Sequence, residues 1–286
     1  EQAVHATTAG TDYRRRVELV QADVRKMRDA LASPLVSECP TMTAHRSQSP
    51  IHIDGKLDEE AWLSTPTQGL VLKSGEAPPY HSWLATSYDE EFLYLGIVNI
   101  EPNLSALRTL ADPQNAAAGI WDDDCVEVFV SPDANNRRQA FQIIVNAAGV
   151  TWDGAYGLPV PGPGLFGCQP GWDCTGLRAA VKKTNSRWTV ELAIPFAAIG
   201  VEAGRLPGTI AMNVFRCRSC GQGPVYTAWS PPLVEQHYCP DRFGVVVVSP
   251  TSVSSQDPTV LLPRSEDDVG SGAAAGPGWY TPGGVL

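Results

Sequence analysis

The chain lacks the features of several large protein classes. It contains no run of 18 apolar residues, which is the length that a membrane-spanning helix needs. Its 21 Lys and Arg residues stand against 31 Asp and Glu residues, so the formal net charge is −10. An acidic surface repels both nucleic-acid phosphates and anionic membranes. The composition therefore argues against membrane insertion and against a nucleic-acid partner.

Signatures of catalysis are missing as well. The chain has no Gly-x-Ser-x-Gly motif, which places the nucleophile of many hydrolases, and no phosphate-binding loop. Carboxylate pairs such as Asp58 and Glu59 lie in turn-like sequence, where acidic side chains are normally solvated. We therefore predict a protein that is not an enzyme.

Seven cysteines and one glycosylation sequon, Asn103-Leu-Ser105, indicate passage through an oxidising secretory compartment. The first residue is Glu1, as in a mature protein after signal-peptide removal or in a trimmed chain. We predict a secreted, extracellular or cell-surface protein that is glycosylated at Asn103.

The cysteine number is odd, so at least one thiol is free or paired between chains. Cys125 lies in a buried-looking strand and is our candidate for a free core thiol. Cys217 and Cys220 have the spacing of half a zinc site or a redox pair, but no second Cys-x-x-Cys accompanies them. Structural disulfides are the favoured role for the loop cysteines, namely Cys168, Cys174, Cys217, Cys220 and Cys239.

The chain divides into three segments. Residues 1–48 are predicted to form an arm, an amphipathic helix from Thr11 and a linker from Pro40 to Pro50. Apolar residues between Tyr13 and Leu31 recur at heptad spacing, which requires a partner surface on this domain or on a second copy. Residues 251–286 are rich in Pro, Gly and Ser and are predicted to form an extended tail.

The central segment, residues 49–250, has an all-β pattern. Short alternating runs are separated by turn residues at intervals of about ten positions. The clearest strands are expected at residues 82–87, 92–99, 125–131, 140–146, 177–183, 188–194, 209–216 and 243–248. We predict a mainly β protein built as a two-sheet antiparallel, jelly-roll-like β-sandwich.

The most informative stretch is Ile120 to Val130. Trp121 and three aspartates precede a strand in which Cys125, Glu127 and Phe129 share one face. Carboxylates beside an aromatic ring bind a hard cation, a sugar or both. The alternative is a solvated acidic turn with Trp121 as a core residue.

The central segment resembles family 9 carbohydrate-binding modules, within the wider DOMON-like group. Ile53-Asp-Gly-Lys-Leu-Asp-Glu-Glu-Ala-Trp62 is similar to the first strand and turn of that family. Residues 88–95, 121–129, 188–195 and 240–244 resemble its later strands in the same order. The resemblance covers about residues 52–249 and implies a β-sandwich that binds carbohydrate without catalysis.

The resemblance also implies a site. Trp121 corresponds to one of two aromatic residues that clamp a sugar, and the second falls at His237, beside Tyr238. The family arginine falls near Ile143 or Ile144, so this donor is replaced. The predicted sugar site is Trp121, Trp152, His237 and Tyr238, and predicted ligands of a structural Ca²⁺ are Asp54, Asp58, Asp122, Asp123 and Asp124.

Two functional hypotheses follow. In the first, the protein is an extracellular structural subunit that self-assembles with copies of itself into a filament through its helix or tail. In the second, it is a glycan-binding module that stacks a sugar on Trp121, now or formerly attached to a polysaccharide-active protein. The heptad helix and the altered clamp favour the first hypothesis.

Overall fold

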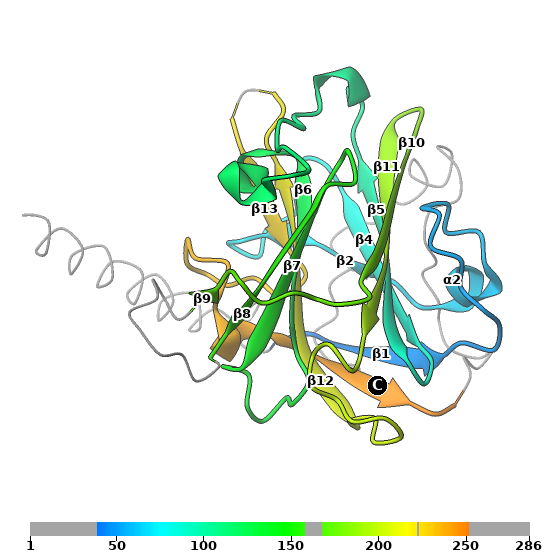
Figure 1. Cartoon of the computed structure of the whole chain (residues 1–286). Coiled ribbons are helices and arrows are strands. Elements are labelled where there is room, and N and C mark those ends of the chain that lie inside the picture. The colour runs from blue at the N-terminus through cyan, green and yellow to red at the C-terminus, as the bar shows by residue number, and fades with distance from the viewer. Residues whose placement is uncertain (1–38, 158–167, 222, 252–286) are drawn as a thin grey trace, which may run out of the picture.

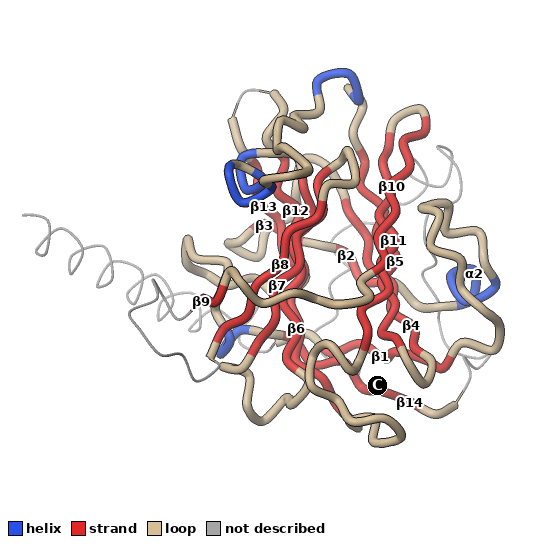
Figure 2. The backbone as a smooth tube through the Cα atoms, in the orientation of Figure 1, coloured by secondary structure: helices blue, strands red, loops and turns tan. Residues whose placement is uncertain are grey.

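The computed structural model describes residues 39–157, 168–221 and 223–251. These residues form mainly β-strands, with one α-helix and several 3-10 turns at the ends of loops (Figures 1 and 2). The strands are β1 (Thr41–Arg46), β2 (Gln68–Gly69), β3 (Val71–Leu72), β4 (Ser82–Tyr88), β5 (Phe92–Ile100), β6 (Cys125–Ser131), β7 (Ala140–Asn146), β8 (Thr151–Tyr156), β9 (Cys168–Gln169), β10 (Arg178–Thr184), β11 (Arg187–Pro195), β12 (Thr209–Arg218), β13 (Val225–Ala228) and β14 (Gly244–Ser249). The helices are α2 (Glu60–Ser64), η1 (Leu104–Ala106), η2 (Ala116–Ala118), η3 (Ile120–Asp122) and η5 (Pro240–Arg242).

All of these strands belong to one continuous mixed sheet. The main order is β10-β11-β5-β4-β1-β14-β12-β6-β7-β8-β9, and β13 pairs with β12. β1 runs parallel to both of its neighbours, β14 and β4, whereas the other pairings are antiparallel. The expected two-sheet antiparallel sandwich is therefore corrected to a single curled sheet with parallel strands. In Figure 2, β4, β5, β10 and β11 lie on one side and β6, β7 and β8 on the other.

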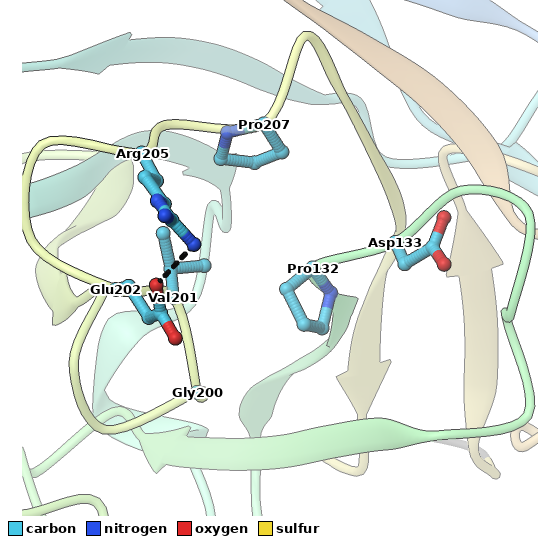
Figure 3. A pocket seen from close by; sticks show the side chains of 7 residues that line it. All are labelled: Pro132, Asp133, Gly200, Val201, Glu202, Arg205 and Pro207. Atoms are coloured by element: carbon cyan, nitrogen blue, oxygen red, sulfur yellow. Dashed lines mark hydrogen bonds and ion pairs between the residues drawn. The ribbon is translucent and has the colours of Figure 1, made fainter.

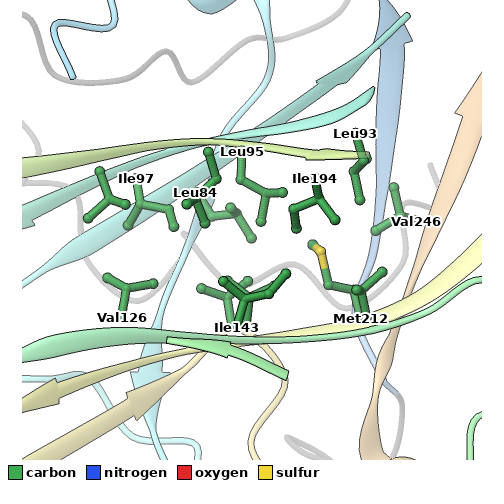
Figure 4. Packing of buried hydrophobic residues seen from close by; sticks show 14 of the residues in the cluster. Leu84, Leu93, Leu95, Ile97, Val126, Ile143, Ile194, Met212 and Val246 are labelled. Atoms are coloured by element: carbon green, nitrogen blue, oxygen red, sulfur yellow. The ribbon is translucent and has the colours of Figure 1, made fainter. Parts of the chain in front are cut away.

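The main core lies between the two halves of this curled sheet. Leu84, Leu95 and Ile97 come from β4 and β5, and they face Val126 and Ile143 of β6 and β7 (Figure 4). These side chains are almost completely buried. Because alternate residues of a strand point to opposite faces, the other residues of β6 and β7 must lie on the outer face of their half.

Each of the eight clearest expected strands overlaps a strand of the structure, but β1, β8, β13 and the two-residue strands β2, β3 and β9 were not expected. The first strand that the resemblance implied at Ile53–Trp62 is wrong, because this segment contains no strand and ends in α2. The linker expected at Pro40 to Pro50 is wrong for β1, whose Met42 and Ala44 are buried in the main core. The reason is that β1 has six residues and only two buried apolar side chains, so the apolar alternation that indicates a strand is weak in this segment. In β8, Gly154 interrupted the alternation of side chains that indicates a strand. The structure explains this glycine, because a Cβ at that position would meet the Trp152 side chain at 2.7 Å.

The expected N-terminal helix and C-terminal tail lie outside the described residues. Within the part of the chain that the structure describes, no helix combines the length and hydropathy needed to cross a bilayer. The division of the chain into three segments therefore stays a prediction, with the sheet beginning at Thr41 rather than at residue 49.

Candidate functional site

The outer face of the β6 half carries the sequence-predicted site residues. Strand register places Trp152 of β8, Ile144 of β7, Glu127 of β6 and Phe215 of β12 side by side. We call the outward-facing side chains of β6, β7, β8, β12 and β13, with the loop residues that cover them, the outer face. Two apolar clusters lie on it, one around Ile144 and one around Phe129.

Trp121 is the exposed aromatic residue of this face. It belongs to the 3-10 turn η3, directly before β6, and 42% of its surface is accessible. Its ring meets that of Trp152 edge to face, with centroids 4.8 Å apart and an interplanar angle of 61°. Edge-to-face contact fixes the ring orientation and leaves much of Trp121 open to solvent. The interpretation of Trp121 as a core residue is therefore wrong.

A hydrogen-bonded network occupies the middle of the face. Glu127 is 3% exposed, and its two carboxylate oxygens bond to different partners. Gln142 of β7 donates its amide to one oxygen, and the Nδ1 of His237 bonds to the other. Tyr156 extends the network by donating to the Gln142 carbonyl at 2.7 Å. The buried carboxylate is thus held in one orientation by two neighbouring groups.

Aromatic contacts hold His237 over Glu127. Its ring stacks on Phe215 with centroids 4.4 Å apart and an angle of 11°, and Tyr226 of β13 packs against its edge at 5.4 Å. The His237 side chain is 18% exposed. Lys73 lies over the Tyr226 ring at 4.7 Å from the centroid. These contacts hold the partly exposed His237 side chain over the buried hydrogen-bonded network of Glu127.

Tyr238 lies at the opposite end of the face from the tryptophans. It stacks on Tyr156 with centroids 4.1 Å apart and donates its hydroxyl to the Arg138 carbonyl. Burial raises the pKa of the Tyr238 hydroxyl, so it stays a neutral donor. The predicted site residues therefore share one face, with Trp121 and Trp152 in contact and Tyr238 in a separate aromatic stack.

The aspartates beside Trp121 are used to hold backbone. Asp123 is fully buried and accepts hydrogen bonds from the backbone amides of Leu110 and Ala111 and from Asn146. Asp124 is also buried and accepts from the amides of Arg108 and Ser219. These donors satisfy the carboxylates and tie the loop before η2 to the start of β6.

Asp54 and Asp58 contribute to a different part of the molecule. Asp54 pairs with Lys56, whose hydrogen bond lowers the pKa of this exposed carboxyl, and Asp58 is exposed. Glu191 accepts from the backbone amides of Asp54 and Gly55, which anchors this segment on β11. Calcium binding by these aspartates stays a prediction.

The cysteines all lie among the described residues, and none of them forms a disulfide. Cys125 and Cys217 face each other across β6 and β12, and the pKa of the Cys125 thiol is raised by its hydrogen bond with Cys217 and by burial. Burial also raises the pKa of Cys174 and Cys220 to about 12 and that of Cys239 to about 11. The structure pairs none of the loop cysteines for which disulfides were predicted, Cys168 included, so this pairing stays a prediction for an oxidising environment.

Asn103 is exposed at the start of η1, where its side-chain oxygen accepts a hydrogen bond from Ser105. The sequon is thus accessible to modification, and glycosylation at this residue stays a prediction.

Two surface hollows lie away from this face. One, of about 350 Å³, is formed by the loop after β6 and the loop between β11 and β12, where Arg205 pairs with Glu202 at 2.8 Å (Figure 3). Its lining residues are Pro132, Asp133, Gly200, Val201, Glu202, Arg205 and Pro207. The other, of about 470 Å³, lies beside Asp153 and Asp173. No aromatic ring lines either of these described hollows, so neither offers a stacking surface for a sugar.

Sequence reasoning missed several residues of the outer face, chiefly Glu127, Gln142 and Tyr226. Glu127 carried a local signal, because it is the one charged residue in the alternating run of β6 and shares a face with Cys125 and Phe129. Gln142 lies on the next strand opposite Phe129, two residues from Ile144, which is the register partner of Glu127. The resemblance places the family arginine near Ile143 or Ile144. The Gln142 amide therefore reaches the Glu127 carboxylate close to the positions where isoleucine replaces the family arginine.

Comparisons with known proteins agree with this architecture. A putative carbohydrate-binding protein from Bacteroides uniformis ATCC 8492 is 18% identical with a TM-score of 0.59, covering 74% of this chain and all of that one. A family 9 carbohydrate-binding module from Caldicellulosiruptor kristjanssonii, solved with cellotriose, is 13% identical with a TM-score of 0.53, covering 78% of this chain and 99% of that one. The glucose complex of a family 9 module from the same organism gives 12% identity and a TM-score of 0.50, covering 76% and 98%.

Among curated proteins, no relative of this chain was found. The family model described as "Carbohydrate family 9 binding domain-like" matches residues 53–250, well over half of the 286 residues. The description is that of a binding domain, which agrees with the expectation of a non-catalytic protein for this segment. This chain belongs to the carbohydrate family 9 binding domain-like family.

Proposed function

We propose that the outer face binds a glycan, with Trp121 as the stacking platform. The observation that carries this proposal is the exposed Trp121 ring, fixed against Trp152 at the border of a face that also holds a buried carboxylate. The apolar face of a pyranose packs on an aromatic ring, while its hydroxyls need fixed polar partners. The family and the cellotriose and glucose complexes of similar structures support the same class of ligand.

His237 is the polar partner that a bound sugar reaches first. Its Nδ1 is engaged by Glu127, and its ring remains partly exposed, so Nε2 is the nitrogen available to a hydroxyl. Glu127 and Gln142 lie beneath it and orient the imidazole rather than contacting solvent. Tyr238 is held in its own stack and serves as a boundary of the face.

The test is isothermal titration of the full chain with glucose, cellotriose and oligosaccharides of xylan and mannan. We expect heat with at least one of these sugars, and we expect it to disappear in Trp121→Ala because the stacking surface is removed. Trp83→Ala is the matched control, since this partly buried tryptophan lies on β4 in a different cluster. Absence of heat with every sugar, or equal binding by Trp121→Ala, contradicts the proposal.

Self-assembly is a second proposal, and an extracellular setting goes with both. It is supported by the heptad spacing between Tyr13 and Leu31, which requires a partner surface. The segments it invokes lie outside the described residues, so its test is the mass of the full chain in solution.

A further inference from the structure

We propose that Cys217, His237 and Glu127 form a zinc-binding site beneath the outer face. One ligand atom from each of these residues lies within 4.8 Å of the other two. The Cys217 sulfur is 4.0 Å from the Glu127 carboxylate oxygen that also bonds to the His237 Nδ1. The three residues come from β12, the loop before η5 and β6, so the fold rather than the sequence brings them together.

The donor set selects the metal. A thiolate, an imidazole and a carboxylate suit Zn²⁺, whereas Ca²⁺ takes oxygen ligands only. In a tetrahedral zinc site with bonds of about 2.0–2.3 Å, neighbouring ligand atoms lie about 3.4–3.7 Å apart. On metal binding the three ligand atoms, now within 4.8 Å of one another, would adjust to that separation. Three protein ligands leave a fourth position in a tetrahedral site for water or another ligand.

The charge balance at Glu127 also favours a cation. The described partners of this buried carboxylate are an amide, an imidazole and a thiol, none of which carries a permanent positive charge. A buried carboxylate without a cationic partner is costly, and a bound divalent ion removes that cost. The site therefore has ligands of the right type around a negative charge that needs compensation.

A second buried trio, Glu101, Asp124 and Cys220, shows the contrast. There the Glu101 carboxylate already bonds to the guanidinium groups of Arg216 and Arg218, at 3.2 and 2.6 Å. Permanent cations thus occupy the position that an ion would need. We assign the metal to the Cys217 trio for this reason.

Neighbouring groups orient the ligands. Stacking on Phe215 fixes the His237 ring, and the Gln142 amide holds the second oxygen of Glu127. Such supporting contacts are what metal sites use to keep ligands in place. The inference does not rest on glycan binding, because Trp121 contributes no ligand and metal binding has its own readout.

The test uses the full chain, kept reduced and freed of metal by a chelator that is then dialysed away. Titration with Co²⁺, a spectroscopic substitute for Zn²⁺, is expected to saturate at one equivalent and to give a thiolate-to-cobalt charge-transfer band that Zn²⁺ abolishes. Cys217→Ser is expected to lose the band. His237→Ala, at a partly exposed loop position, is expected to weaken Co²⁺ binding by more than roughly tenfold.

Cys220→Ser and Trp121→Ala are the controls, and both are expected to bind Co²⁺ as the unaltered chain does. The proposal is overturned if the unaltered chain gives no charge-transfer band, if Cys217→Ser retains it, or if only Cys220→Ser loses it. Loss of sugar binding in Trp121→Ala with retained Co²⁺ binding separates this site from the proposed function.

Discussion

At the scale of single residues, Trp121 and the aspartates beside it illustrate how neighbours in sequence take different roles. Trp121 faces solvent, whereas Asp123, two residues later, is fully buried. The 3-10 turn η3 changes the direction of the chain between these two residues, so that their side chains point to different environments. A short acidic run thus presents a ring outward and uses its carboxylates inward as acceptors for backbone amides.

We expect Asp123→Asn to lower the free energy of unfolding by about 1–3 kcal/mol. The amide offers one acceptor oxygen where the carboxylate accepted three hydrogen bonds, so at least one buried amide of the Leu110 loop loses its partner. Urea unfolding of both proteins measures the difference.

Asp122→Asn is the matched control for Asp123→Asn, because Asp122 is the exposed neighbour, and a change within about 0.5 kcal/mol is expected. If Asp123 serves as a calcium ligand instead, added Ca²⁺ should stabilise the unaltered protein and leave Asp123→Asn unaffected. That outcome would favour the calcium hypothesis over the structural role argued above.

At the scale of elements, a buried ionic cluster joins the end of β5 to β12. Glu101 follows β5 and bonds to Arg216 and Arg218 of β12, and all three side chains are almost completely buried. Arg218 also lies over the Tyr80 ring at 4.0 Å from the centroid. Because β5 and β12 belong to opposite halves of the curled sheet, the cluster links those halves beyond the apolar core.

We expect Glu101→Gln to lower the free energy of unfolding by about 3–5 kcal/mol, because two buried guanidinium groups lose their counter-charge. Chemical denaturation at neutral pH measures this loss. Glu202→Gln removes the exposed partner of Arg205 and is expected to cost less than about 1 kcal/mol. Similar effects of the two substitutions would contradict the role assigned to the Glu101 cluster.

The same cluster gives a pH dependence. Burial alone would raise the pKa of Glu101, but hydrogen bonds from Arg218 and other donors outweigh it, and the pKa is lowered. A lowered folded-state pKa contributes stability that is present above the unfolded pKa and is lost as the pH falls through the folded value. We expect unfolding free energy to fall on acidification more steeply in the unaltered chain than in Glu101→Gln, as urea titrations at several pH values would record.

At the scale of the whole molecule, the question is whether the terminal segments join copies of the chain. The described strands lie between Thr41 and Ser249, whereas the heptad segment and the Gly-rich tail lie outside the described residues. If these segments mediate assembly, light scattering should show large particles for the full chain and a monomer for a chain of residues 39–251. If both chains are monomers, the self-assembly proposal fails and glycan binding remains the proposed function.

Much of the strand pattern and part of the candidate site could be predicted from the sequence. The alternation in β6 placed Cys125, Glu127 and Phe129 on one face, and Trp121 was identified beside it. His237 was also identified, but its contact with Glu127, 110 residues away, was not. Local patterns report which face a residue occupies, and they carry no information on which distant loop covers that face.

The sequence by itself determined the β character of the central segment and the inner and outer faces of its strands, because side-chain alternation is a local property of extended backbone. The tertiary structure decided which strands are neighbours: β1 enters between β14 and β4 in parallel and turns the expected sandwich into one sheet. It also decided that Cys217, His237 and Glu127 meet. Both outcomes depend on packing between segments far apart in sequence, where shape and burial of the whole core select one pairing.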